Sequence, residues 1–243
     1  METIQNIVEY YEELFPVTEE QRKFFDELLK TYSAPAKLLR IGCGTGQYEH
    51  QLSKSGADVT GLETSRELLD SANRRRRTQL MSIRFFQMTA LEMTRFLGKG
   101  FYNVISCLES RIIFVHDYTL MRKFFYDCKQ LLAPNGSLVL SLINFNAIEP
   151  APTIHLPARE SIRAKLFTDI ITADNEDVFL NMNVENSVGK LLPVLERERI
   201  YPLIKEEIED FAKESGFKHL EFYSDFAKNP LTDNSPNVVC VLR

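Results

Sequence analysis

The fold is decided by the stretch Lys37-Leu38-Leu39-Arg40-Ile41-Gly42-Cys43-Gly44-Thr45-Gly46. A short, mainly apolar run ends in glycines at alternate positions, and a segment with helical character follows. This is the pattern of a buried strand that turns sharply into a helix. Glycine here permits unusual φ/ψ values and lets a ligand approach the backbone with no Cβ in the way. The stretch therefore predicts a ligand site at the carboxyl end of a strand.

An acidic residue follows the next strand-like run, which extends from Asp58 to Leu62. Glu63 stands about 20 residues after the glycines, where a carboxylate can accept hydrogen bonds from both hydroxyls of a ribose. The glycines do not fit the dinucleotide pattern G-x-G-x-x-G, because Gln47 stands where its last glycine would be. The spacing thus predicts a nucleoside-containing cofactor and weakens the case for NAD.

Composition narrows the class of protein. The 243 residues include 44% hydrophobic residues, which is enough for a full core, and the net charge of −5 argues against a general nucleic-acid binder. The four cysteines form no C-x-x-C pair and no metal-ligand spacing, which suits a reducing cytosol. No uninterrupted apolar run reaches about 18 residues, and the amino terminus has no signal-peptide pattern. We expect a cytoplasmic protein without a membrane span or a metal site.

Strand and helix patterns alternate through the first half of the chain, and this predicts an α/β fold with a doubly wound, mostly parallel sheet. Two further strand patterns near the carboxyl terminus bring the expected sheet to seven strands. The expected strands are 37–41, 58–62, 83–87, 102–107, 137–143, 218–224 and 237–242. The expected helices are 45–55, 65–77, 90–96, 117–132 and 204–215.

The pattern divides the chain into three parts. Residues 1–35 form an amino-terminal helical segment, in which Thr18-Glu19-Glu20-Gln21 is a capping-box pattern. Residues 36–144 and 201–243 form the core, where Thr64-Ser65-Arg66-Glu67 predicts a helix start just behind Glu63. Residues 145–200 form a small β-rich insertion that we expect to act as a lid, with strands near 165–172, 178–184 and 190–200.

The glycine stretch resembles motif I of the class I S-adenosylmethionine-dependent methyltransferases. Val59-Thr60-Gly61-Leu62-Glu63-Thr64-Ser65 is similar to their second motif, and Phe85-Phe86-Gln87-Met88-Thr89-Ala90-Leu91 to the segment that embraces adenine. The segments 101–110 and 131–140 resemble the fourth and fifth strands of that family. The ends of the chain, with Tyr11-Glu12-Glu13-Leu14-Phe15-Pro16 and Tyr201-Pro202-Leu203, are similar to the small-molecule enzymes related to glycine/sarcosine N-methyltransferases. The resemblance implies a Rossmann-like methyltransferase fold and S-adenosylmethionine as cofactor.

The resemblance also implies roles for particular residues. The implied cofactor-binding residues are Gly42, Cys43, Gly44, Gly46, Glu63, Thr64, Thr89, Ala90, Leu91, Cys107 and Leu108. The candidate catalytic residues are Tyr11 and His116, and the candidate substrate residues are Ser110, Arg111, Arg199 and Tyr201. Several of these residues also have a purely structural interpretation. Tyr11 and Tyr201 could simply pack in the core or lid, Arg111 could form a surface ion pair, and His116 could be an exposed residue.

Three positions depart from the family pattern, with Arg40 and Thr89 where acids are usual and Tyr102 where aspartate is frequent. They motivate a rival hypothesis, in which a non-catalytic or regulatory protein keeps the fold and a degenerate cofactor site. The favoured function is methyl transfer from S-adenosylmethionine to a small molecule, with nitrogen favoured over oxygen. A nucleic-acid methyltransferase is disfavoured, because no N-P-P-Y or D-P-P-Y follows the fourth strand, and an NAD-dependent oxidoreductase is the weakest option. The sequence leaves the oligomeric state open.

Overall fold

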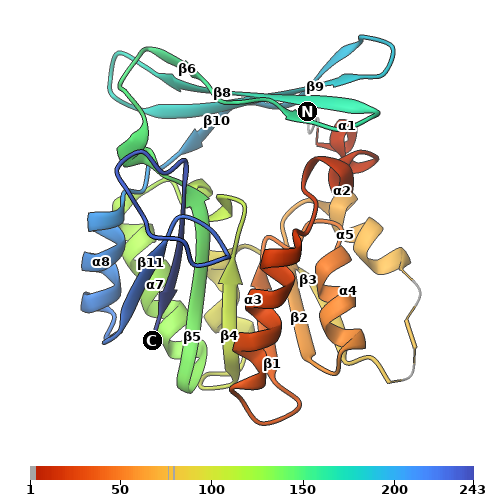
Figure 1. Ribbon diagram of the computed structural model, residues 1–243, viewed down its shortest axis with the longest axis vertical. Helices are drawn as coiled ribbons and strands as arrows, with labels where there is room; N and C mark the ends of the chain where they lie inside the picture. Colours follow the sequence, from red (N-terminus) through yellow and green to blue (C-terminus); the bar gives the residue numbers. More distant parts are fainter. Residues whose placement is uncertain (1–3, 76, 79) are drawn as a thin grey trace.

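A seven-stranded sheet forms the centre of the protein, in the order β11-β12-β5-β4-β1-β2-β3 (Figure 1). The computed structural model describes residues 4–75, 77–78 and 80–243. Parallel pairing joins β3, β2, β1, β4 and β5, whereas β12 is antiparallel to both of its neighbours. The strands are β1 (Lys37–Ile41), β2 (Asp58–Glu63), β3 (Ile83–Gln87), β4 (Tyr102–Cys107), β5 (Leu132–Ile143), β11 (Leu220–Tyr223) and β12 (Asn237–Leu242). The predicted α/β class with a mostly parallel sheet is confirmed.

Helices cover both faces of this sheet, because neighbouring strand residues point to opposite sides. Leu38 packs with Phe24 and Phe25 of α3, whereas Leu39 lies in the cluster that contains Phe124 of α7 and Phe211 of α8. Two apolar layers therefore enclose the sheet. The helices of the core are α3 (Glu19–Lys30), α4 (Gln47–Lys54), α5 (Arg66–Arg74), α6 (Met93–Phe96), α7 (Tyr118–Leu131) and α8 (Lys205–Glu214).

The strand order places β1 beside β4, so the chain leaves these neighbours toward opposite edges of the sheet. Such a switch point leaves a crevice at the carboxyl ends of the two strands, where open α/β sheets bind ligands. The glycine loop follows β1 and the segment from Leu108 follows β4. The topology thus brings these two segments together.

A second, antiparallel sheet lies across the carboxyl-terminal end of the core sheet (Figure 1). Its order is β10-β9-β8-β6, and β7 pairs with β8. Two of its strands, β6 and β7, are only three and two residues long and have no counterpart among the expected strands. The strands are β6 (Thr153–His155), β7 (Arg159–Glu160), β8 (Ala164–Thr172), β9 (Val178–Asn186) and β10 (Leu191–Ile200).

The amino-terminal segment packs against this second sheet. Ile7 of α1 (Gln5–Val8) and Leu14 of α2 (Tyr11–Leu14) join one apolar cluster with Leu166, Val184 and Val194. Full burial of an aliphatic side chain contributes roughly 1.5–3 kcal/mol relative to exposure, so this cluster holds the segment on the lid. The chain between α2 and α3 then crosses back to the core (Figure 1).

The helix after Glu63 begins one residue later than the sequence pattern indicated. Ser65, rather than Thr64, is the N-cap of α5, and its hydroxyl accepts a hydrogen bond from the Leu68 amide. The reason lies in Glu63, whose carboxylate accepts hydrogen bonds from the amides of Thr64 and Ser65 and keeps both outside the helix. The helix ends at Arg74, short of the expected residue 77, and residue 76 of the expected span lies outside the described residues.

Candidate active site

The glycine loop is held in a conformation that suits only glycine. Gly42, Gly44 and Gly46 have φ values of 71°, 57° and 67°, in the left-handed region where a Cβ is unfavourable. The amides of Gly42 and Cys43 both donate to the Leu62 carbonyl at 2.9 Å, which ties the loop to the end of β2. The loop backbone therefore turns sharply at the switch point in a conformation that glycine favours.

Glu63 is anchored beside the loop by backbone amides. Its side chain is buried, its Oε2 accepts from the Gly44 amide at 2.9 Å, and its Oε1 accepts from the amides of Thr64 and Ser65 at 2.8 and 3.1 Å. Each carboxylate oxygen has two lone pairs, so Oε2 retains one for a further donor. This fixed, buried carboxylate is suited to receive a hydroxyl.

Two side chains from distant segments lie over the glycine loop. A Cβ built on Gly44 would lie 2.5 Å from the Tyr11 hydroxyl, and one on Gly42 would lie 2.7 Å from Cγ of Arg111. Nη2 of Arg111 donates a hydrogen bond of 2.9 Å to Tyr11 Oη. Tyr11, from α2, and Arg111, from the segment after β4, therefore form one unit above the loop.

A tight turn aims Arg111 in this direction. Glu109 and Ser110 both adopt the left-handed conformation, with φ of 55° and 58°. This conformation is uncommon outside glycine, and it clusters at functional sites. Ser110 fixes the turn, because its amide donates to the Ser141 carbonyl and its hydroxyl accepts from the Ile143 amide. The short helix of residues 111–114 then begins with Arg111 pointing back across the loop.

Arg40 lies buried under the same loop, where the family pattern has an acid. Its Nε lies 3.6 Å from Glu49 Oε1 of α4, which is too long for a hydrogen bond, and neither Nε nor Nη1 has a hydrogen-bond partner. Burial raises the pKa of Glu49, and the charge of Arg40 opposes that rise. Arg40 also lines a small cavity of about 40 Å³ with Tyr11, Glu12 and Thr45. Beside the loop there is thus a buried pair of Arg40 and Glu49, in which Arg40 has N–H groups without a hydrogen-bond partner.

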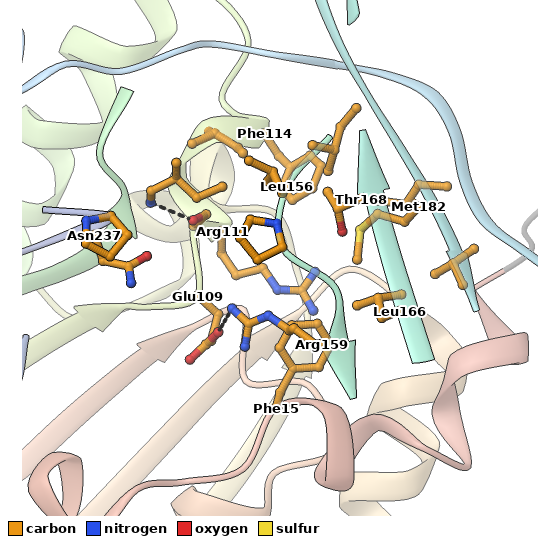
Figure 2. A pocket seen from close by; sticks show the side chains of 18 of the residues that line it. Phe15, Glu109, Arg111, Phe114, Leu156, Arg159, Leu166, Thr168, Met182 and Asn237 are labelled. Carbon is orange, nitrogen blue, oxygen red and sulfur yellow. Dashed lines mark hydrogen bonds and ion pairs between the residues drawn. The ribbon is translucent and has the colours of Figure 1, made fainter. Parts of the chain in front are cut away.

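A much larger cavity of about 570 Å³ separates the core from the lid. In Figure 2 the Arg111 guanidinium points into it, with Leu166 and Thr168 of β8 and Met182 of β9 on the lid side. These lid residues share one face of the second sheet. Leu166 and Thr168 lie two residues apart on β8, and Thr168 pairs with Met182 on β9. Further lining residues are Ile7, Phe15, Ile113, Phe114, Asn144, Ile148, Leu156, Leu180, Leu195, Asn234 and Asn237.

Charges in this cavity are few. Oε2 of Glu109 forms an ion pair of 2.8 Å with Arg159, which also packs over the Phe15 ring. Burial raises the pKa of Tyr11, so its phenol stays protonated at neutral pH. Burial opposes the charge of Arg111, but the oxygen atoms of Tyr11 and Glu63 outweigh that effect and raise the pKa of the guanidinium. Arg111 is therefore a permanent cation.

The remaining predicted cofactor residues lie in two different environments. Thr64 is exposed, and Thr89 caps a short helix by donating its hydroxyl to Glu92 at 2.8 Å. Ala90 and Leu91 follow it at the end of β3, partly buried against the core. By contrast, Cys107 and Leu108 are fully enclosed by core side chains, and burial raises the pKa of the Cys107 thiol to about 12.

Three of the predicted catalytic and substrate residues lie away from both cavities. His116 is exposed, and Arg199 is exposed and paired with Asp177 at 2.5 Å. The Tyr201 hydroxyl donates to Glu207, and burial, together with that carboxylate, raises its pKa. Tyr11, Ser110 and Arg111, in contrast, all line the lid cavity. The cavity also has lining residues that the sequence did not indicate, namely Phe15, Arg159 and the inward-facing residues of β8 and β9. For the residues of β8 and β9, the available signal was the alternation of apolar positions along each strand.

Two other kinds of site find no support in the described part of the chain. No helix there combines the length and the apolar character that a bilayer span requires. No group of three or more histidine, cysteine, aspartate or glutamate side chains there is arranged to hold a metal ion.

Comparison with known proteins shows which proteins this chain resembles. Residues 38–136 match the family described as a methyltransferase domain. The ubiquinone biosynthesis O-methyltransferase of Erwinia tasmaniensis is 32% identical over 112 residues, which are 46% of this chain and 44% of the relative. The chain thus spans less than half the length of that relative.

Solved structures extend the likeness of fold over almost the whole chain. An S-adenosylmethionine-dependent methyltransferase from Clostridium acetobutylicum superposes with a TM-score of 0.78 at 14% identity, over 98% of this chain and 97% of that one. The sugar N-methyltransferase KedS8 from Streptoalloteichus has a TM-score of 0.66 at 15% identity, over 96% and 90% of the two chains. The second sheet thus lies within the part of the fold that these structures share.

Residues 38–136 thus match a methyltransferase domain, and the whole chain has the fold of S-adenosylmethionine-dependent methyltransferases, which makes S-adenosylmethionine the expected cofactor. The residues present fit this cofactor. Glu63 offers a buried lone pair at the end of β2, and Arg40 offers buried N–H donors that have no other hydrogen-bond partner. Tyr11 and Arg111 lie over the glycines, so both would border the cofactor's methionine portion.

Proposed function

We propose that the protein transfers the methyl group of S-adenosylmethionine to a small molecule bound in the lid cavity. The observation that carries this proposal is the position of Tyr11 and Arg111, which lie over the glycine loop and also line the cavity of about 570 Å³. Cavities of roughly 300–1,000 Å³ are typical of small-molecule sites. An acceptor in the cavity would therefore meet the cofactor at these two side chains.

The chain's own residues would contribute mainly position and exclusion of water. The cofactor supplies an activated methyl group, so transfer depends on alignment more than on a catalytic triad. In this proposal Glu63 receives ribose hydroxyls, the glycine loop supports the methionine portion, and the lid strands cover the acceptor. Tyr11 closes the space between the two ligands from α2, as its predicted catalytic role requires.

The acceptor atom belongs to the proposal as well. The sequence favoured nitrogen over oxygen, and that preference stays a prediction. The relatives include a ubiquinone biosynthesis O-methyltransferase and a sugar N-methyltransferase, so they support both acceptors. The cavity gives more support to oxygen, because its one lining carboxylate among the described residues, Glu109, is already paired with Arg159 and is not free to hold a cationic amine.

The three departures from the family pattern do not favour the non-catalytic rival. Arg40 has a buried carboxylate partner in Glu49, Thr89 caps a helix, and Tyr102 is buried in the core. Each therefore has a structural role in a folded, pocket-bearing domain, and none of them closes the lid cavity.

The test separates the acceptor site from the cofactor site. Thr168 faces the cavity from β8, whereas its neighbour Phe167 lies on the other face of the strand. We expect Thr168→Trp to abolish formation of S-adenosylhomocysteine from a panel of amines, phenols and acids, measured by mass spectrometry, while calorimetric affinity for S-adenosylmethionine stays within about twofold. Phe167→Trp is the matched control and should keep both. Full turnover by Thr168→Trp would place the acceptor elsewhere.

A further inference from the structure

Among the described residues that line the lid cavity, cations outnumber carboxylates by one. Its charged lining residues are Arg111, Arg159 and Glu109, and Glu109 is paired with Arg159 at 2.8 Å. Arg111 has no carboxylate within 4 Å among residues 4–75, 77–78 and 80–243, and its one side-chain hydrogen bond goes to the neutral phenol of Tyr11. The carboxylate of Glu63 raises the pKa of Arg111 from a distance beyond 4 Å, but the hydrogen bonds of Glu63 go to backbone amides.

Arg111 is partly buried, and a cation that has no paired carboxylate there favours a ligand that brings an anion. The guanidinium presents several N–H donors in a plane, which match the two oxygens of a carboxylate. In Figure 2 this group points inward among the other lining side chains. The charged end of a ligand would therefore lie beside Tyr11 and the glycine loop.

The rest of the ligand would meet mainly apolar walls. Phe114 lines the cavity from the core side, Phe15 lines it from the amino-terminal segment, and Leu156, Leu166 and Met182 line it from the lid (Figure 2). A polar body such as a sugar would leave hydroxyls without partners along these walls, and each buried unpaired hydroxyl is unfavourable. An apolar body would be stabilised by burial.

The cavity also lacks a free general base among its described lining residues. The candidate histidine, His116, is exposed outside it, Glu109 is held by Arg159, and Tyr11 is a protonated phenol that already accepts a hydrogen bond from Arg111. An ammonium or hydroxyl acceptor would need a base to remove its proton. A carboxylate arrives deprotonated and needs none.

We propose that the acceptor is an amphipathic carboxylic acid, held through its carboxylate by Arg111 and methylated on that carboxylate, an inference that rests on the proposed function. A carboxylate oxygen forms a bond to the methyl carbon while the bond between that carbon and sulfur breaks. The bonding pair stays on sulfur, which loses its positive charge, and the products are a methyl ester and S-adenosylhomocysteine. No proton is taken up or released.

Calorimetry on the full chain loaded with S-adenosylhomocysteine tests the recognition step. The probes are decanoate against decanamide and 4-butylbenzoate against 4-butylbenzamide, so that only the charge of the head group changes within each pair. We expect at least one acid to bind about tenfold or more tightly than its amide. Arg111→Met should remove that preference and Arg111→Lys should keep part of it. Arg95→Met, which removes a charge from an exposed position of α6, should not change it.

Each alternative outcome is distinct. Equal binding of acid and amide, or an unchanged preference in Arg111→Met, would overturn the assignment of Arg111. Loss of S-adenosylhomocysteine affinity in Arg111→Met, with acid binding intact, would show that Arg111 serves the cofactor's carboxylate and would overturn it too. Failure of the wild type to bind S-adenosylhomocysteine would instead count against the proposed function. With S-adenosylmethionine present, the acid that binds should yield its methyl ester by mass spectrometry, and its recovery unchanged would exclude the carboxylate as acceptor.

Discussion

The guanidinium of Arg111 donates a hydrogen bond of 2.9 Å to the hydroxyl of Tyr11, a residue 100 positions earlier in the chain. This bond joins the amino-terminal helix α2, which packs on the lid, to the turn that follows β4 in the core. Because both side chains lie over the glycine loop, the contact connects the amino-terminal segment, the lid cavity and the glycine loop.

The first prediction concerns the strength of this contact. A hydrogen bond to a charged group contributes about 1.5 kcal/mol. The losses of unfolding free energy in Tyr11→Phe and Arg111→Met should therefore not add in the double variant. Urea denaturation of both single variants and the double variant should give a coupling free energy of about that size. Additive effects would mean that the bond does not stabilise the fold.

The second prediction compares two glycines whose φ values are 57° and 96°. Gly44 and Gly56 both have positive φ, but a Cβ on Gly44 would overlap Tyr11, whereas one on Gly56 meets nothing within 4 Å. Gly56→Ala should therefore cost only about 1 kcal/mol of backbone strain. Gly44→Ala should cost more and should also weaken S-adenosylmethionine binding at least about tenfold by calorimetry. Equal stability and unchanged affinity in the two variants would contradict the position assigned to Tyr11.

The third prediction concerns the buried pair of Arg40 and Glu49. Removing one partner of such a pair leaves an unpaired buried charge, so Arg40→Met should lower the free energy of unfolding by about 3 kcal/mol. The double variant Arg40→Met/Glu49→Leu should recover most of that loss, because no charge is then left buried. A double variant no more stable than the single one, in thermal or urea denaturation, would show that an unpaired Glu49 is not the cause of the loss.

The fourth prediction tests the ribose site. Glu63→Ala should weaken S-adenosylmethionine binding by about tenfold or more, because it removes charge-assisted hydrogen bonds. Glu67→Ala is the matched control, since that acid lies in the first turn of α5 and outside the loop. Wild-type affinity in Glu63→Ala, measured by calorimetry on folded protein, would refute the assignment.

Much of the core could be predicted from sequence because its signals are local. The alternation of strand and helix patterns gave the fold class, and the glycines with Glu63 gave the carboxyl-terminal edge of the sheet. The lid strands were visible through their alternation. The short strands β6 and β7 could not be predicted, because three or two residues are too few to show an alternation of apolar and polar positions.

The lid cavity was harder to predict because it depends on packing between distant segments. Nothing local indicates that Glu109 and Ser110, neither of them glycine, adopt left-handed conformations and turn Arg111 over the loop. The partnership of Arg40 with Glu49 likewise depends on how α4 packs on β1. The roles assigned to Tyr11, Ser110 and Arg111 stay predictions, although the structure gathers all three at one cavity.

Calorimetric titration of the purified protein with S-adenosylmethionine and S-adenosylhomocysteine, with NAD as control, tests the central claim most directly. The structure predicts dissociation constants on the order of micromolar for the first two and no binding of NAD. Absence of binding to both sulfur nucleosides by folded protein would contradict the account, because Arg40, Thr89 and Tyr102 would then mark a site that no longer holds its cofactor.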